Sequence, residues 1–359
     1  YLDWIAVFRP NGKRINRTGM QFGVMGAGTG YGRGAGRLHS QWLRELGIDI
    51  MRETVTGDRI EQGDGIENYA DMGRPIQTLQ DAGVDICFSY MFGVPEYVRG
   101  KGTSTKYVGG NGEAFRTHIR RVLTFLSRYP AVKYFEWWNE ADGKTFDDSM
   151  KHYVQTLHIL REERDRIMPK LKILNSGVTT ADREGRRENT LEMISGGRQD
   201  IDVACFHSHG LLDAYKTSQA FMCDVLNKVY GNPDFPVCNT ESGERGGYTA
   251  ESILAHAPQM IRKIVYAKTF NTRFFIFFIL RDYWDLDPGA DDSFGMFTAD
   301  NRPKPMVPAY NELIRQLADT ERGEEIQLHP SLTAYRFRKC FENRDVIVLW
   351  PTVGEQRNP

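Results

Sequence analysis

Short apolar runs and helix-like segments alternate eight times along this chain of 359 residues, and this alternation restricts the fold more than any other feature. The runs lie at 21–25, 48–52, 84–90, 134–138, 171–175, 201–207, 235–241 and 273–279. Each has the length and continuous hydrophobicity of a strand that is buried on both faces. Strands that alternate with helices favour a parallel sheet, and eight such units predict an α/β fold closed into a (β/α)8 TIM barrel.

The two ends of the chain follow a different pattern. Residues 1–18 hold one strand-like run before a Pro-Asn-Gly turn signal at 10–12. Near the other end, 332–337 and 345–349 alternate like strands and flank a polar turn, which predicts a hairpin. We therefore expect a barrel domain at 19–320, with 1–18 and 321–359 forming a small β layer packed beside it.

Two of the expected strands stop abruptly on a carboxylate. The fourth runs through two tryptophans into Asn139 and Glu140, and the seventh runs into Glu241. The C-terminal strand ends of such a barrel carry the chemistry. Two carboxylates placed there meet the requirement for glycoside hydrolysis, with one acid and one nucleophile or base. Glu140 as a surface helix cap, or Glu241 in a structural ion pair, are the plainer alternatives, and Glu244 competes less well because it lies further into the loop.

The sequence around the two carboxylates suits different roles. Trp137 and Trp138 can provide an apolar wall for Glu140, which has to carry its proton when the leaving oxygen departs. The neighbours of Glu241 are polar, and polar neighbours favour an ionised carboxylate. This contrast favours Glu140 as the acid and Glu241 as the nucleophile.

Trp138-Asn139-Glu140 and the strand end at Glu241 resemble clan A of the glycoside hydrolases, with the nearest similarity to family 39 and family 5 enzymes. The resemblance extends over roughly residues 20–320. It implies a retaining glycosidase that cleaves an oligo- or polysaccharide by double displacement. Glu140 would be the acid/base and Glu241 the nucleophile, with no metal or organic cofactor.

The resemblance also implies roles for residues around the carboxylates. Arg52 would hydrogen-bond the nucleophile, although a plain structural salt bridge would explain it as well. Asn139 would hydrogen-bond the 2-hydroxyl of the sugar, unless it only caps its own loop. His207 or His209 would lie beside the nucleophile, with His207 favoured.

Sugar-contacting aromatic residues are harder to assign. The clan usually places a tryptophan after the eighth strand, but this strand ends in Phe278, and Trp284 follows only later. Trp284 is therefore the candidate platform. Tyr90 and Trp138 are further candidates for the substrate groove, and ordinary packing accounts for Tyr90 equally well.

Two alternatives to an active glycosidase come from different classes. A non-catalytic carbohydrate-binding barrel would keep the groove, but both carboxylates are present, which argues against it. Gly30, Gly32 and Ala35 fit the dinucleotide-binding pattern G-x-G-x-x-A, with Glu53 at a suitable distance. A dinucleotide-dependent oxidoreductase would leave the two strand-end carboxylates without a role, so a glycine loop at the rim of the cleft is favoured.

Composition excludes some partners. The formal net charge of −1 gives no reason to expect nucleic acid or a membrane surface. No apolar run could span a membrane and no signal peptide is visible, while the family resemblance favours a secreted or periplasmic protein. The five cysteines are odd in number and lack a CxxC pair, so we expect buried free thiols. His207 and His209 alone are a weak metal signal, and we expect no metal.

Overall fold

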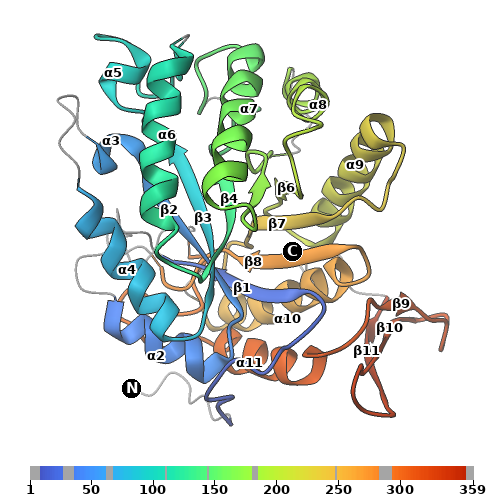
Figure 1. Ribbon diagram of the computed structural model, residues 1–359. Helices are drawn as coiled ribbons and strands as arrows, with labels where there is room; N and C mark the ends of the chain where they lie inside the picture. The colour runs from blue at the N-terminus through green and yellow to red at the C-terminus, as the bar shows by residue number, and fades with distance from the viewer. Residues whose placement is uncertain are drawn as a thin grey trace.

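The computed structural model describes residues 9–26, 36–61, 68–109, 111–143, 145–179, 185–246, 249–282 and 293–352. Eight strands form one sheet in the order β5-β4-β3-β2-β1-β8-β7-β6, and helices surround it (Figure 1). Parallel bridges from Leu174 to Val203 and from Val178 to Phe206 join the two edge strands. The sheet is thus a nearly closed parallel barrel, and the expected TIM barrel is confirmed.

The strands of the barrel are β1 (Gln21–Met25), β2 (Ile50–Thr56), β3 (Asp85–Phe92), β4 (Val132–Trp137), β5 (Lys172–Leu174), β6 (Ala204–His207), β7 (Val237–Ser242) and β8 (Thr272–Phe277). The helices are α2 (Gly36–Leu46), α3 (Gly57–Ile60), α4 (Tyr69–Asp81), α5 (Glu96–Arg99), α6 (Gly112–Leu126), α7 (Met150–Ile167), α8 (Arg186–Gly196), α9 (Leu212–Tyr230), α10 (Ala250–Ala267) and α11 (Met306–Leu317). The short helices α3 and α5 follow β2 and β3 and were not expected from the sequence.

Local chemistry sets the ends of the longer helices. The side chain of Asn111 accepts a hydrogen bond from the Ala114 amide at the start of α6, and Ser149 does the same for His152 at the start of α7. Such caps satisfy amide groups that the helix itself leaves without an acceptor. α9 ends at Gly231, which has a φ of +67° and so adopts the left-handed conformation that glycine favours.

The barrel has two apolar layers. The larger one lies between the sheet and the surrounding helices. The smaller one fills the inside of the barrel and comprises Met25, Ile50, Cys87, Leu174, Val203, Cys205, Cys238, Phe274, Ile276 and Ile279. Alternate residues of a strand point to the same face, so Arg52 lies one inward position beyond Ile50, towards the carboxyl end of the barrel. The inner layer therefore separates the two ends.

All five cysteines are free, but the expected burial holds for only three of them. Cys87, Cys205 and Cys238 are buried, whereas Cys223 is partly exposed and Cys340 is exposed. Among the described helices, none is both long and apolar enough to cross a membrane.

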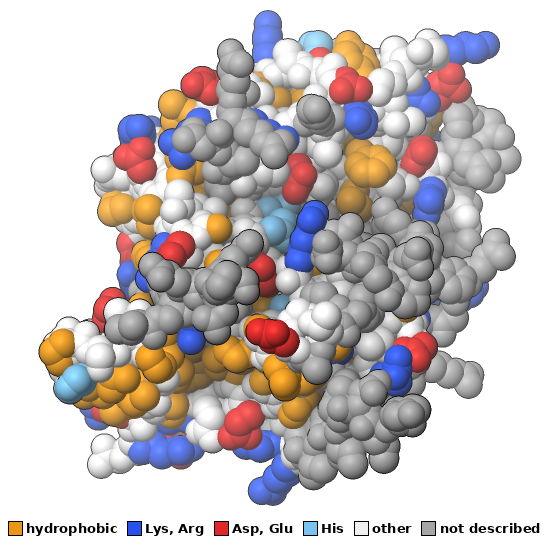
Figure 2. Space-filling model, turned by 180° about the vertical axis from the view of Figure 1, so that it is seen from behind, with side chains coloured by type: hydrophobic (Ala, Val, Ile, Leu, Met, Phe, Trp, Pro, Cys, Tyr) orange, Lys and Arg blue, Asp and Glu red, His pale blue; other side chains and the backbone are white. Residues whose placement is uncertain are grey.

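A small antiparallel sheet follows the barrel. Its strands are β9 (Glu324–Glu325), β10 (Leu332–Arg338) and β11 (Asp345–Pro351), in the order β11-β10-β9, so the expected hairpin is confirmed. Apolar side chains gather on its outer side (Figure 2), where Leu328, Ile347 and Leu349 are each about half exposed.

The amino-terminal strand expected near residues 1–8 lies outside the described residues. The described residues 9–18 contain no strand and run along the amino end of the barrel. There Asn16 donates a hydrogen bond to Asp49, and Arg17 pairs with Asp319. Arg17 also lies over the ring of Phe341, close to the small sheet. The division of the chain at 19–320 stays a prediction.

Candidate active site

Glu140 follows β4 on an unusual turn. Trp138 has a φ of +71° and Glu140 a φ of +51°, values that residues with a Cβ seldom adopt. The turn is held from both sides. The amide of Trp138 donates to the carbonyl of Tyr90 at 2.8 Å, and the hydroxyl of Thr145 donates to the carbonyl of Glu140 at 2.8 Å. Backbone conformations of this kind cluster at functional sites, where the surrounding structure has to enforce them.

Glu241 lies within β7, and the adjoining strand fixes its backbone. The amide of Ser208 donates to the carbonyl of Glu241 at 2.9 Å, and the hydroxyl of Ser242 returns a bond to the carbonyl of Ser208 at 2.7 Å. The carboxylate lies 3.5 Å from Nε2 of His209. The side chain of Glu241 is 9% exposed, whereas that of Glu140 is 28% exposed. Both carboxylates therefore reach the surface of the site, Glu140 more openly.

Arg52 joins three of the site residues. Its guanidinium lies 2.5 Å from Oε1 of Glu241, 2.6 Å from Oε2 of Glu136 and 2.9 Å from Oδ1 of Asn139. Burial alone would lower the pKa of Arg52, but the two carboxylates outweigh it and raise the pKa. The guanidinium is therefore a permanent, fully buried cation that fixes the orientation of all three neighbours.

His207 lies among three carboxylates. Its Nδ1 is 3.0 Å from Oε1 of Glu140 and 3.7 Å from Oε2 of Glu241, and its Nε2 is 3.8 Å from Oε1 of Glu136. Burial would lower the pKa of His207, but the three carboxylates, Glu241 foremost, raise it to about 10. His207 is therefore protonated at neutral pH and donates a hydrogen bond to Glu140.

The same cations keep the other two acids ionised. Burial would raise the pKa of Glu241, but His207 and Arg52 hold it well below its usual range. Burial would also raise the pKa of Glu136, and Arg52 and His207 lower it to about 2. Glu136 is fully buried and was not among the residues expected from the sequence. The sequence did offer a signal for Glu136, because a charged residue inside the apolar run of β4 has to find a partner in the interior.

The structure gives an upper limit for the distance between the nearest oxygens of Glu140 and Glu241, the two expected catalytic carboxylates. One oxygen of Glu140, one of Glu241 and a ring nitrogen of His207 all lie within 4.8 Å of one another. Retaining glycosidases hold their two carboxyl groups about 5–5.5 Å apart, and inverting ones about 6.5–9.5 Å apart. The nearest oxygens of the two carboxyl groups are thus at most 4.8 Å apart, closer than the spacing between the groups of an inverting enzyme.

Within the described part of the chain, these three groups also form a cluster that could hold a metal ion. A metal would have to displace the proton that the carboxylates stabilise on His207, because only neutral imidazole is a ligand. It would also compete with Arg52, which already lies 2.5 Å from Glu241. The donor set therefore suits a proton better than a metal.

Two residues expected to contact the sugar do not face the site. Tyr90 is fully buried, and its hydroxyl hydrogen-bonds Nε2 of His118 at 2.8 Å. Trp138 is also fully buried, and its indole N–H donates to the carbonyl of Thr145 at 3.0 Å. Both expectations are corrected because these rings pack under the strand ends and expose no surface to a ligand. Asn139, Arg52, His207 and His209 are brought together around the carboxylates.

Trp284 and most of the glycine-rich loop, residues 27–35, lie outside the described residues. Phe278 directly follows β8, which ends at the buried Phe277, and is partly exposed. Its ring lies edge-on to His209 at 5.1 Å and to Phe294 at 5.4 Å between centroids. These two phenylalanines form an apolar wall beside His209. The closed barrel also differs from the doubly wound sheet that a dinucleotide-binding loop would require.

A buried lysine supports the loops after β6 and β7 from behind. Nζ of Lys263, on α10, donates to the carbonyls of Gly210 at 2.8 Å, Gly243 at 3.2 Å and Ser208 at 3.3 Å. Burial lowers the pKa of Lys263 to about 7. Lys263 ties together the segments that carry His209 and Glu241, and its position on the apolar face of a helix was the signal in the sequence.

Gly177 makes room for the charged cluster. A Cβ at this position would lie 2.1 Å from Nε2 of His207 and 2.8 Å from Oε1 of Glu136. Only glycine allows the loop after β5 to approach these groups so closely. No local pattern in the sequence indicated this role.

No protein-family model and no curated protein sequence matches the chain. Its fold is similar to solved structures of glycoside hydrolases. A family 39 enzyme from Bacteroides cellulosilyticus WH2 aligns with a TM-score of 0.70 and 14% identity, covering 93% of this chain and 71% of that one. A GH5_18 enzyme from Bifidobacterium longum subsp. infantis gives a TM-score of 0.65 and 16% identity, with 84% and 80% covered.

A psychrophilic family 10 endo-β-1,4-xylanase gives a TM-score of 0.58 and 12% identity, with 81% of this chain and 96% of that chain covered. These likenesses concern the fold, since identities this low do not carry over an activity. The expected resemblance to clan A glycoside hydrolases is confirmed at that level.

Proposed function

We propose that the chain is a retaining glycoside hydrolase that acts on an oligo- or polysaccharide. The observation that carries the proposal is the pair Glu140 and Glu241, with carboxylate oxygens within 4.8 Å of each other and different surroundings. Glu241 contacts two cationic groups, Arg52 at 2.5 Å and His207 at 3.7 Å. The side chain of Glu140 is more exposed, at 28% against 9% for Glu241. Two carboxylates with distinct environments are the basis for assigning an acid and a nucleophile.

In the first step, Glu241 attacks the anomeric carbon while Glu140 protonates the departing glycosidic oxygen. The bond from carbon to the leaving oxygen breaks as the bond to Oε of Glu241 forms, which gives a glycosyl ester. In the second step, Glu140 takes a proton from water, the water oxygen attacks the same carbon, and Glu241 leaves as a carboxylate. Two inversions at one carbon produce net retention.

Asn139 is assigned to the sugar itself. Its Oδ1 accepts from Arg52 at 2.9 Å, and because a guanidinium can only donate, this bond fixes which way the amide is turned. The Asn139 NH₂ group then remains to donate to a sugar hydroxyl. A hydrogen bond to the 2-hydroxyl strengthens as charge develops on the ring, so its benefit falls mainly in the transition state.

Product stereochemistry tests the mechanism. The full chain is screened against aryl glycosides and polysaccharides, and proton NMR identifies the first-formed anomer of the best substrate. We expect the anomer to keep the configuration of the substrate. An inverted first product would reject Glu241 as the nucleophile, and a complete absence of turnover with retained sugar binding would favour the non-catalytic carbohydrate-binding barrel.

Variants separate the roles of the two acids. Glu241→Ala should abolish turnover of every substrate. Glu140→Ala should lower kcat/KM about 10²–10⁴-fold on substrates with poor leaving groups, but spare the first step on dinitrophenyl glycosides, which need no protonation. Added azide should then release a glycosyl azide of retained configuration. Glu244→Gln is the matched control and should keep activity; if it loses activity while Glu241→Ala does not, Glu244 is the nucleophile.

A further inference from the structure

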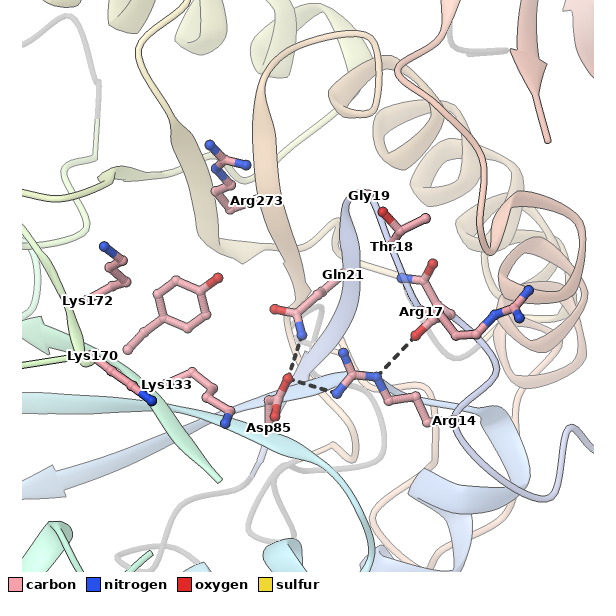
Figure 3. A pocket seen from close by; sticks show the side chains of 12 residues that line it. Arg14, Arg17, Thr18, Gly19, Gln21, Asp85, Lys133, Lys170, Lys172 and Arg273 are labelled. Carbon is pink, nitrogen blue, oxygen red and sulfur yellow. Dashed lines mark hydrogen bonds and ion pairs between the residues drawn. The ribbon is translucent and has the colours of Figure 1, made fainter. Parts of the chain in front are cut away.

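A cavity of about 400 Å³ opens at the amino end of the barrel, opposite the carboxylates (Figure 3). Residues at or near the starts of β1, β3, β4, β5 and β8 line it, together with Arg14 and residues 16–19. Its volume lies within the range of about 300–1,000 Å³ that is typical of small-molecule sites. Figure 3 shows Lys133, Lys170 and Lys172 on one side of the cavity and Arg14 and Arg17 on the other.

The lining is strongly cationic. It contains six basic side chains, namely Arg14, Arg17, Lys133, Lys170, Lys172 and Arg273, and one carboxylate, Asp85. The whole chain has a formal net charge of −1, so this excess is a local feature rather than an average one. Like charges gathered around one cavity repel each other, and an anion inside it would relieve that repulsion.

The single carboxylate is already occupied. Oδ2 of Asp85 accepts from Arg14 at 2.8 Å and from Gln21 at 2.7 Å. Arg14 also lies 3.2 Å from Asp49. These bonds fix the floor of the cavity and leave Asp85 with little to offer the remaining cations.

Half of these basic side chains have no acidic partner among the residues that the structure describes. Arg17 pairs with Asp319 and Lys172 lies 3.9 Å from Asp202, both outside the cavity lining. Within the described part of the chain, Lys133, Lys170 and Arg273 form no ion pair. Three cations from β4, β8 and the turn before β5 are thus available to a ligand.

We propose that this cavity binds a small organic anion that carries a phosphate or sulfate ester. Arginine offers a fork of N–H groups that matches such an oxyanion, and lysine adds a mobile charge. A cavity of about 400 Å³ exceeds the space that one inorganic ion fills, so an organic group accompanies the anion. The partly buried ring of Tyr134 lines the same cavity and offers it an apolar surface.

The proposed anion site is independent of the proposed glycosidase. The inner apolar layer, with Ile50, Cys87 and Phe274, lies between the two ends of the barrel. Substitutions at Lys133 and Arg273 therefore leave turnover unchanged. The failure of one proposal does not affect the other.

Isothermal titration calorimetry of the full chain at low ionic strength tests the site with four probes: glucose 6-phosphate, galactose 6-sulfate, inorganic phosphate and glucose. We expect one equivalent of a sugar ester to bind more tightly than inorganic phosphate, with no heat from glucose. Comparing glucose 6-phosphate with galactose 6-sulfate shows whether the site prefers a phosphate ester or a sulfate ester. Raised salt should weaken binding, because the contacts are ionic and partly exposed.

The double variant Lys133→Gln/Arg273→Gln should bind the ester at least about tenfold more weakly, which corresponds to about 1.4 kcal/mol. Lys151→Gln/Arg338→Gln removes the same charge from exposed positions elsewhere and is the matched control. An equal loss in the control would show unspecific attraction and overturn the site. The proposal also fails if neither ester binds, or if only long polyanions such as heparin bind.

Discussion

At the carboxyl end of the barrel, Arg52 and His207 lie buried among Glu136, Glu140 and Glu241, at distances of 2.5 to 3.8 Å. At the amino end, Lys133 and its neighbours are exposed around a cavity that holds one carboxylate. Buried charges are stable only when they are paired, whereas exposed ones are screened by water and salt. The charged cluster at the carboxyl end, called the upper cluster below, is therefore fixed by its own partners. The basic cluster at the amino end, called the lower cluster, is open to a partner from solution.

The largest effect should come from removing the central cation of the upper cluster. Arg52→Met removes the main counter-charge of buried Glu136 and one of the two cations beside Glu241, so we expect the free energy of unfolding to fall by about 3–5 kcal/mol. Urea denaturation followed by circular dichroism measures it. If the free energy of unfolding falls by less than about 1 kcal/mol, the charges at the carboxyl end are as well solvated as those at the amino end. The contrast between the two ends of the barrel would then be wrong.

A smaller loss should follow from crowding the same cluster. Gly177→Ala places a methyl group 2.1 Å from Nε2 of His207, and overpacking of this kind costs about 1–3 kcal/mol. Gly112→Ala is the control, because its Cβ would meet only the tip of the Ile159 side chain at 3.3 Å and the amide of Gln155 at 3.5 Å. Equal melting temperatures for both variants would show that the loop after β5 can withdraw from His207.

The pH dependence of stability should distinguish His207 from the exposed cations. Its pKa is raised from 6.5 to about 10 in the folded chain. The stability it contributes is therefore complete below pH of about 6.5 and is lost as the pH rises through about 10, with a slope of up to about 1.4 kcal/mol per pH unit.

Subtracting the curve of His207→Gln from that of the wild type isolates this slope, because Lys263 titrates in both proteins. Lys133→Gln is the control and should keep the slope of the wild type. If the difference between the wild type and His207→Gln is flat from pH 6.5 to 10, the carboxylates do not hold a proton on His207.

The smallest effect is expected at the amino end. Lys133→Gln/Arg273→Gln removes two exposed charges that form no ion pair in the described structure, so the free energy of unfolding should change by less than about 0.5 kcal/mol. Relief of like-charge repulsion makes a slight gain the expected sign at low salt. A loss above about 1 kcal/mol would assign these side chains a structural role and remove the contrast between the two ends.

Much of the barrel follows from the sequence, because each strand is a short apolar run and several of the longer helices end at a glycine or proline signal. α7, for example, ends at Ile167, two residues before Pro169, and β4 ends at Trp137, two residues before Asn139. Strand-end chemistry likewise indicated Asn139 and Glu140. Patterns of this kind are local and can be seen without the fold.

The parts that were missed depend on contacts between distant segments. Glu136 gains its role from Arg52, 84 residues away, and Gly177 gains its role from the close approach of His207. Tyr90 and Trp138 have the same residue types as sugar-binding platforms, and only packing shows that their rings are covered. Residue type indicates what a side chain can do, whereas exposure decides whether it does so.

The position of His207 between the two catalytic candidates has a consequence for the proposed reaction. In the state that the proposed first step requires, Glu140 carries its proton and is neutral, Arg52 and His207 carry two positive charges, and Glu136 and Glu241 carry two negative ones. In the glycosyl ester, Glu241 is neutral and Glu140 has become the anion, so the site again sums to zero. The negative charge moves only from 3.7 Å to 3.0 Å from Nδ1 of the same imidazolium. Neither half-reaction then needs a counter-ion to enter or leave, and dissolved salt should alter the two rates little.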